Sequence, residues 1–328
     1  MDLKKLPDWK EVAKGVSRLT GHSPFYHLAD MVGCYVRYGC DEVQYGEGGF
    51  YRLSPAERRN TYTKQRAYAL RPVFNPEADR HLCQRKEAFN RFFARYVRRP
   101  WLYCGDASVE EIQAFIEAQP RVIVKQADAM QGSGIHALDL SAGAMDGAAE
   151  GVAAVARPLC GQDVLLERWI DQHPDLCFGN ASVNTIRVTT VRDPQGQVHL
   201  LKAVFRCGVG DAVVDNFTAG GVVYPLDLER GVIEGPGTRK HSLAEGPIAV
   251  HPGTETPMVG RAIPFWPEAL AMIRDVAATI PGLRLIGWDI AITPVGPELV
   301  EGNTLPGPAL LEYVGEKKGF YQEILSYR

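Results

Sequence analysis

Residues 287–292 read Gly287-Trp288-Asp289-Ile290-Ala291-Ile292, and residues 301–307 read Glu301-Gly302-Asn303-Thr304-Leu305-Pro306-Gly307. The first stretch is apolar and alternating, and the turn residues 293–297 separate it from the second, which predicts a hairpin. Glu301 and Asn303 are one residue apart, so both side chains leave the returning strand on one face, where Asp289 can meet them. Mg²⁺ prefers such oxygen ligands, so these three residues are the predicted metal ligands.

A hairpin with polar residues on a solvent-facing side is the simpler interpretation. It is disfavoured because the first strand is mostly apolar, and an unpaired carboxylate buried there would be costly. The Glu-x-Asn-x-x-Pro-Gly ending, preceded by an Asp on the previous strand, resembles the magnesium-binding signature of ATP-grasp ligases, the superfamily of D-alanine–D-alanine ligase and biotin carboxylase.

A candidate phosphate loop lies upstream of the hairpin. A short β-branched strand at 121–125 ends in Lys125 and is followed by the loop residues Gln131, Gly132, Ser133 and Gly134. Backbone N–H groups of such a loop can contact phosphate oxygens, and Lys125 adds a positive charge. The glycines alone are typical of a turn, but their place after this strand favours nucleotide binding. No Gly-Lys-Ser/Thr follows, so the pattern is not a P-loop.

The segment 163–170 is an apolar strand interrupted by one carboxylate, that of Glu167. The resemblance implies that this is the hinge, where Glu167 and the neighbouring Arg168, Trp169 and Ile170 bind the adenine of ATP. The alternative is an outward-facing Glu167 paired with Arg168. For the ribose hydroxyls Asp171 and Asp175 compete, and Asp175 is the chosen candidate.

A third element is the segment 86–97. Its aromatic and apolar residues fall at helical spacing, which predicts an amphipathic helix with one buried face. They are Phe89, Phe92, Phe93, Tyr96 and Val97. The resemblance implies that Lys86, at the start of this helix, reaches the nucleotide phosphates, although a solvated Lys remains the competing interpretation.

Two arginines, Arg187 and Arg206, each interrupt an apolar strand run, where a guanidinium needs a partner. A structural salt bridge is one explanation. The resemblance favours another, in which they face the γ-phosphate and the substrate carboxylate, so both are catalytic candidates and Arg187 is also a substrate candidate. Lys202 is a further catalytic candidate. The remaining substrate candidates are Asn216, Gly220, Gly221 and the loop histidine His241, for which a plain surface position is the alternative.

The wider pattern, over roughly 80–312, is similar to ATP-grasp proteins found next to sugar-transfer genes, including glutamate-ligase-like members. It is carried by Lys86 and the segments 98–102, 184–188, 205–208, 215–217 and 220–221. The resemblance implies an α+β ATP-grasp fold, with two α+β subdomains clasping ATP and a mainly helical N-terminal region. The expected parts are 1–105, for acceptor recognition, 106–166, the small lid subdomain, and 167–328, the large subdomain with the metal site.

Composition agrees with a soluble, cytoplasmic enzyme. The chain has 328 residues and 45% hydrophobic content, enough for a large core. No apolar run approaches the ~20 residues of a membrane span, and Met1-Asp2-Leu3-Lys4-Lys5 opens no signal peptide. Residues 51–100 hold 13 Lys and Arg against 4 Asp and Glu, which predicts that at least one substrate is anionic. The aromatic spacing there fits a core face better than a nucleic-acid platform.

These features together predict an ADP-forming, ATP- and Mg²⁺-dependent ligase that joins a carboxylate to an amine through an acylphosphate. The expected cofactors are ATP and two Mg²⁺ ions. The expected partners are small-molecule or glycan substrates in polysaccharide, peptide or secondary-metabolite biosynthesis, with no nucleic acid and no membrane span, and an oligomer stays open. The two alternatives are a phosphotransferase on the same scaffold and a non-catalytic nucleotide-binding module of an assembly complex.

Overall fold

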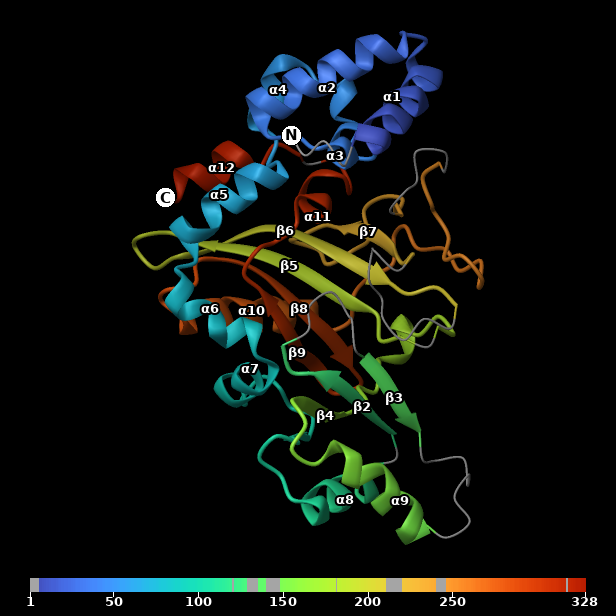
Figure 1. Cartoon of the computed structure of the whole chain (residues 1–328), viewed down its shortest axis with the longest axis vertical. Helices are drawn as coiled ribbons and strands as arrows, with labels where there is room; N and C mark the ends of the chain where they lie inside the picture. Colours follow the sequence, from blue (N-terminus) through green and yellow to red (C-terminus); the bar gives the residue numbers. More distant parts are fainter. Residues whose placement is uncertain are drawn as a thin grey trace.

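The computed structural model describes residues 6–119, 121–128, 135–139, 148–180, 182–210, 220–239, 246–316 and 318–328. Within these ranges, helices accompany two antiparallel sheets, one of four strands and one of five (Figure 1). The predicted α+β class and the mainly helical N-terminal region are confirmed.

Between residues 6 and 92 the chain is mainly helical. They are α1 (Leu6–Thr20), α2 (Pro24–Tyr38), α3 (Glu42–Gly46), η2 (Phe50–Arg52), α4 (Pro55–Asn60), α5 (Lys64–Phe74), α6 (Glu77–Gln84) and α7 (Lys86–Phe92). The helices α1 to α3 share a core of their own around Trp9, Met31 and Phe50, at the end of the molecule opposite α8 and α9 (Figure 1). By contrast, α5 packs on the large sheet through Phe74 and Leu285. The region expected as one N-terminal unit therefore divides near residue 60.

The small sheet has the strand order β1-β4-β2-β3. Its strands are β1 (Trp101–Tyr103), β2 (Arg121–Gln126), β3 (Ile135–Asp139) and β4 (Val164–Arg168). The helices α8 (Val109–Glu117) and α9 (Ala148–Ala156), which leads into η3 (Arg157–Leu159), cover one face with buried side chains such as Ile112 and Ile116. Ser108 and Glu111 form the capping box that starts α8, as the sequence predicts. Since β1 pairs with β4, the small subdomain begins before the expected residue 106.

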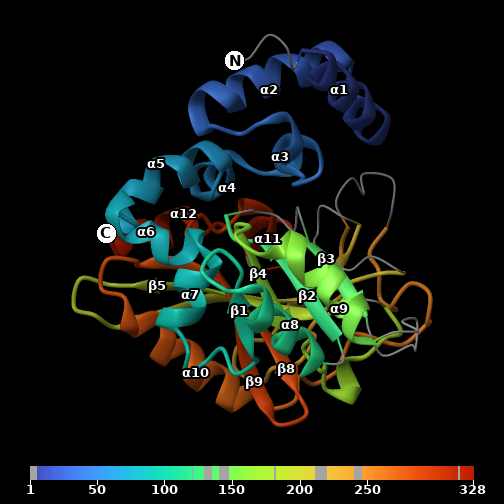
Figure 2. The same ribbon diagram turned by 60° about the horizontal axis from the view of Figure 1, so that its bottom comes forward.

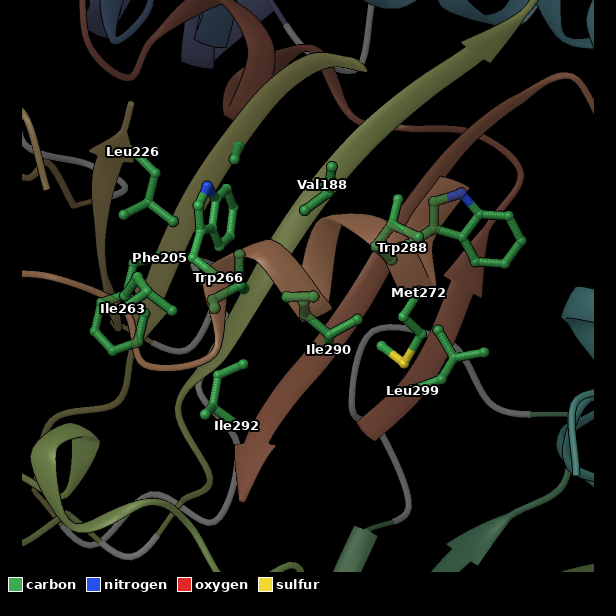
Figure 3. Close-up of a cluster of buried hydrophobic side chains, with 14 of the residues drawn as sticks. Val188, Phe205, Leu226, Ile263, Trp266, Met272, Trp288, Ile290, Ile292 and Leu299 are labelled. Carbon is green, nitrogen blue, oxygen red and sulfur yellow. The ribbon is translucent and has the colours of Figure 1, made fainter. Parts of the chain in front are cut away.

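The large sheet has the order β7-β6-β5-β8-β9. Its strands are β5 (Thr185–Arg192), β6 (Val198–Cys207), β7 (Val222–Leu226), β8 (Leu285–Thr293) and β9 (Gly296–Asn303). The predicted hairpin β8–β9 is confirmed, and β5 and β6 form a second one. The helix α10 (Trp266–Thr279) buries its apolar side against one face of this sheet, where Trp266 and Met272 join Val188, Phe205 and Ile290 (Figure 3). The opposite face is apolar near α5, where Val191, Leu201 and Leu285 join a second core, and elsewhere it carries buried charged residues.

Three short helical elements complete the chain, η4 (Pro174–Leu176), α11 (Pro308–Glu312) and α12 (Tyr321–Ser326). The C-terminal helix α12 lies beside α5 in both ribbon views (Figures 1 and 2), and Phe320 and Ile324 share a core with Phe74. Among the described residues, no helix is both long and apolar enough to cross a membrane.

The helix α7 ends earlier than the predicted segment 86–97. Phe89, Phe93 and Val97 are buried as expected, and the Phe93 ring meets Trp288 edge-on at 5.7 Å. Phe92, the last residue of the helix, is 44% exposed and does not join the buried face. Phe89 of α7 reaches β9 closely at Gly302, where an added Cβ would lie 3.2 Å from Phe89 and 3.0 Å from Trp288 of β8.

Candidate active site

The polar face of the large sheet carries the predicted metal residues. Asp289 on β8 lies directly opposite Glu301 on β9, and Asn303 lies opposite Gly287. A β-bulge shifts the register between Asp289 and Ile290, and such bulges re-aim side chains. Cross-strand partners share a face, so the hairpin brings the two carboxylates together as the sequence predicts.

Asp289 is held by the two arginines that interrupt β5 and β6. Arg187 donates from Nε to Oδ1 and from Nη2 to Oδ2, the latter at 2.6 Å, and Arg206 donates from Nη1 to Oδ2 at 2.5 Å. All three residues are buried. Burial alone would raise the pKa of Asp289, but the charges of Arg187 and Arg206 hold it well below its usual range. Both predicted arginines therefore lie at the metal residues, and their partner is Asp289.

Glu301 differs from Asp289 in exposure, since 54% of its side chain is open to solvent. Partial desolvation and the negative charge of Asp289 nevertheless raise the pKa of Glu301, and Arg187, with Nη2 3.7 Å from Oε1, offsets part of this. Two like charges opposite each other on a sheet destabilise it. A divalent cation between these oxygens would relieve that repulsion, so the residues present fit Mg²⁺.

Asn303 completes the predicted set from the end of β9. Its Oδ1 accepts a hydrogen bond from the Leu305 N–H at 2.9 Å, which fixes the amide and leaves one lone pair on the oxygen. Within the described ranges no three His, Cys, Asp and Glu side chains gather as a metal site. A metal here would depend on two carboxylates, the Asn303 amide and non-protein ligands, which is how Mg²⁺ is commonly bound beside phosphates.

Gly287 makes room for the Arg187 side chain. A Cβ at this position would lie 2.9 Å from Cδ of Arg187, in the middle of its path to Asp289. We expect Gly287→Ala to displace the guanidinium and to lower turnover about tenfold, since small misplacements at a reacting centre are costly. Steady-state kinetics checks this, with Gly246→Ala as control because a Cβ at Gly246 meets nothing within 4 Å. Equal turnover in both variants would show that Arg187 tolerates the shift.

The small sheet contributes Lys125 and Glu167 from the face away from α8 and α9. Lys125 pairs with Leu165 across the strands, so Glu167 is its diagonal neighbour, and Nζ of Lys125 lies 2.5 Å from Oε2 of Glu167. Lys86 at the start of α7 donates from Nζ to the carbonyl of Gln126 at 2.7 Å. Burial lowers the pKa of Lys86, the charge of Glu301 opposes this, and the charge of Lys125 adds to it. Charges from both sheets therefore act on one ammonium group.

Glu167 has more partners than its sequence position suggests. Its oxygens accept from Nε and Nη2 of Arg99 at 2.8 and 3.0 Å, from Nδ2 of Asn90 at 2.7 Å, and from Lys125. The alternative pairing of Glu167 with Arg168 is wrong, because Arg168 lies 3.6 Å from Asp171 instead. Asn90 and Arg99 are the contributors that sequence reasoning missed, since they stand in a helix and a loop with no strand pattern to mark them.

The depressed pKa of Glu167 predicts a pH dependence of stability. Burial alone would raise this pKa, but Arg99 and Lys125 hold it far below its usual range. The ionised carboxylate therefore contributes stability that is complete above the unfolded pKa of about 4.3 and is lost progressively as the pH falls below it. In Glu167→Gln this contribution is missing at every pH. Thermal melts from pH 7 to pH 3 should show that the difference in melting temperature between wild type and Glu167→Gln becomes smaller. A difference that grows on acidification contradicts the assignment.

The structure describes only some of the remaining predicted residues. Trp169 stacks under Arg121, whose Cζ is 4.0 Å from the ring centroid, Ile170 is buried, and the exposed Asp175 lies 3.8 Å from His173. Gly220 adopts a φ of 92°, and Gly221 directly precedes β7. Gln131, Gly132, Ser133, Gly134, Asn216 and His241 lie outside the described residues.

Lys202, the third catalytic candidate, contacts the C-terminal part of the chain. It lies on the polar face of β6, but its ammonium donates to the carbonyl of Leu311 at 2.6 Å and to that of Val314. These carbonyls belong to α11 and the turn after it, so Lys202 fixes that segment to the sheet. A catalytic role for Lys202 stays a prediction.

A family model described as sugar-transfer associated ATP-grasp matches residues 66–323, which is more than half of the chain. No curated protein matches. Among solved structures, an ADP complex of N5-carboxyaminoimidazole ribonucleotide synthetase is 11% identical with a TM-score of 0.40, and the match covers 68% of this chain and 45% of that one. The D-alanyl-alanine synthetase A of Vibrio cholerae is 14% identical with a TM-score of 0.42, covering 77% of this chain and 67% of that one. The ATP-grasp ligase PsnB, complexed with a precursor variant, Mg and ADP, is 13% identical with a TM-score of 0.45, covering 80% and 68%. The chain thus spans less than half of the first of these proteins.

Proposed function

The chain belongs to the sugar-transfer associated ATP-grasp family, and on this premise we propose that it is an ATP- and Mg²⁺-dependent ligase joining a carboxylate to an amine. The observation that carries the proposal is the pairing of Asp289 with Glu301 beside Arg187 and Arg206. Two carboxylates suit a cation, and two arginines suit the anionic groups that surround it during transfer.

The two sheets supply different parts of the proposed site. Asp289, Glu301 and Asn303 would hold Mg²⁺, which when bound neutralises the β- and γ-phosphates. Lys125 and Lys86 would bind phosphate oxygens, together with the predicted loop 131–134. The hinge 167–170 would bind adenine, with the Glu167 carboxylate already oriented by Arg99 and Asn90.

In the proposed reaction a substrate carboxylate oxygen attacks the γ-phosphorus, and the bond to the β-phosphate oxygen breaks to release ADP. An amine then attacks the acylphosphate carbon, phosphate leaves, and the amine loses a proton. The protein needs no nucleophile of its own, since phosphoryl transfer depends mostly on positioning and charge stabilisation. Arg187 and Arg206 would stabilise the charge that develops on the transferred group.

The helices before residue 61 are the proposed acceptor-recognition region, because the family match begins only at residue 66. The proposed pathway is polysaccharide, peptide or secondary-metabolite biosynthesis. A screen of amino acids and uronic-acid sugars, alone and in pairs, for ATP-dependent phosphate release tests the ligase proposal. Phosphate release that requires both a carboxylate and an amine, with an amide product, supports it. A stable phosphoester with ADP would identify a phosphotransferase instead, and nucleotide binding without turnover would identify a binding module.

Separate substitutions should distinguish binding from chemistry. We expect Lys125→Ala to weaken ATP binding about tenfold by removing one phosphate contact, as for a typical charged hydrogen bond. We expect Arg206→Lys to lower kcat by at least about tenfold with a smaller change in the KM for ATP, because it keeps the charge near Asp289 but loses the planar fork. Initial rates across an ATP series check both. If Arg206→Lys changes only the melting temperature, Arg206 is a structural partner of Asp289.

A further inference from the structure

Arg99 occupies the junction between the two sheets. It stands in the connection from α7 to β1, and only 1% of its side chain is exposed. Its fork reaches Glu167 on β4 of the small sheet and Glu298 on β9 of the large sheet, with Nη1 2.9 Å from Oε1 of Glu298. Both carboxylates are themselves buried, with side-chain exposures of 4% and 6%. One guanidinium therefore joins one carboxylate from each sheet.

Its contacts on β9 extend to the backbone at the β-bulge. The register passes from Asp289 opposite Glu301 to Ile290 opposite Leu299, so Val300 has no partner residue on β8. Arg99 donates from Nη1 to the Leu299 carbonyl at 2.8 Å and from Nη2 towards the Val300 carbonyl at 3.4 Å. The Arg99 backbone N–H also donates to Glu298 at 3.0 Å. Arg99 thus supports the bulge that immediately precedes Glu301.

We propose that Arg99 is a positioning residue that couples the hinge carboxylate Glu167 to the metal carboxylate Glu301. The inference rests on the proposed function of both sites. Arg99 fixes Glu167 with two hydrogen bonds while Lys125 has only one, so Glu167 stays oriented when Lys125 turns to a phosphate. The same guanidinium holds the strand that aims Glu301. Nucleotide at the hinge and metal at β9 therefore depend on one rigid group.

This coupling makes a specific claim about Glu298. Glu298 lies three residues before Glu301 and contacts Arg99. It is not among the residues proposed to bind nucleotide or metal. If Arg99 couples the two sheets, Glu298→Gln on the large sheet should still change nucleotide binding at the small sheet. A residue that only stabilises the fold would change the melting temperature and leave the affinity of the folded protein unaltered.

The test measures ADP binding by calorimetry on the full chain, at saturating Mg²⁺ and across a Mg²⁺ series. We expect Glu298→Gln and Arg99→Lys each to weaken ADP binding about tenfold and to raise the half-saturating Mg²⁺ concentration by a similar factor. The matched control is Arg98→Lys, since Arg98 is the exposed neighbour of Arg99 and should match wild type. In the double variant the two effects should not multiply, because both weaken the same ion pair.

The outcomes separate the inference from the function on which it rests. If wild type binds ADP with Mg²⁺ but Glu298→Gln binds it equally well, the coupling is overturned while the proposed nucleotide site stands. Multiplying effects in the double variant also overturn it. If wild type itself binds no ADP, both the inference and the proposed function fall. Because Glu298→Gln preserves shape, it keeps the test informative even if Arg99→Lys fails to fold.

Discussion

Glu301→Gln is expected to lower Mg²⁺-dependent ATP turnover by at least about 100-fold, the upper range found even for groups that only support metal ligands. The substitution keeps the size of the side chain but removes one of two carboxylate charges that a divalent cation would balance. Because the Glu301 side chain is 54% exposed, the free energy of unfolding should change by less than about 1 kcal/mol. Phosphate release and thermal melts on the same preparation measure the two effects.

A matched exposed position is Glu268 in the first turn of α10. Glu268→Gln also removes one negative charge but lies in a helix on the apolar side of the sheet, so its turnover should equal that of wild type. Near-normal turnover of Glu301→Gln would remove this residue from the metal site. A large loss of stability would show that its contact with Arg187 is structural.

Asp289→Asn is expected to have a different result, with loss of both turnover and stability. Asp289 is the buried partner of Arg187 and Arg206, and Asn has one acceptor oxygen where the carboxylate has two. The amide NH₂ would then face an arginine N–H, and two buried positive charges would lose their balance. Breaking such a buried pair costs about 3–5 kcal/mol.

Denaturant unfolding gives the stability of Asp289→Asn relative to Glu301→Gln. The predicted order is a clear loss for Asp289→Asn and almost none for Glu301→Gln, with both inactive. Equal stability of the two variants would contradict the ion-pair network around Asp289. Leu or Met at positions 187 and 206 together with Asp289→Asn should recover part of the stability without activity, since a buried network can be replaced by apolar packing.

The sequence predicts the fold well where a local pattern repeats. The hairpin β8–β9 follows from an apolar alternating run, a turn and a second run, and the strand period then places Asp289 and Glu301 on one face. The capping box of Ser108 and Glu111 locates the start of α8 in the same way. The strand β1, with only three residues, gives no such signal, so the boundary expected at residue 105 leaves it in the N-terminal region.

The candidate site is predictable only in part, because its polar contacts join distant positions. Arg187 and Arg206 were marked as arginines in need of a partner, but nothing near them in sequence identifies Asp289 as that partner. From the sequence, Arg99 is one charge of the basic segment 51–100 and part of the segment 98–102 that carries the resemblance, with no role of its own. In the structure it is fully buried between Glu167 and Glu298.

The same burial changes the interpretation of the basic segment. Arg58 forms two hydrogen bonds with Asp30, and Arg85 forms two with Asp163, so much of the excess charge is balanced by acids elsewhere in the chain. The net charge of residues 51–100 does not reveal such ion pairs, because it includes the arginine of each pair but not the acid. An anionic acceptor stays a prediction, and it now depends on the exposed members of the segment, such as Arg91 and Arg95.

The central claim is one site in which nucleotide and Mg²⁺ bind together, and calorimetry of ADP binding to the wild-type chain with and without Mg²⁺ tests it most directly. Binding to both the hinge and a shared cation predicts that Mg²⁺ tightens ADP binding by at least about tenfold, a coupling of about 1.4 kcal/mol. By reciprocity, ADP should tighten Mg²⁺ binding by the same factor. Absence of ADP binding, or an affinity that does not change with Mg²⁺, would contradict the account.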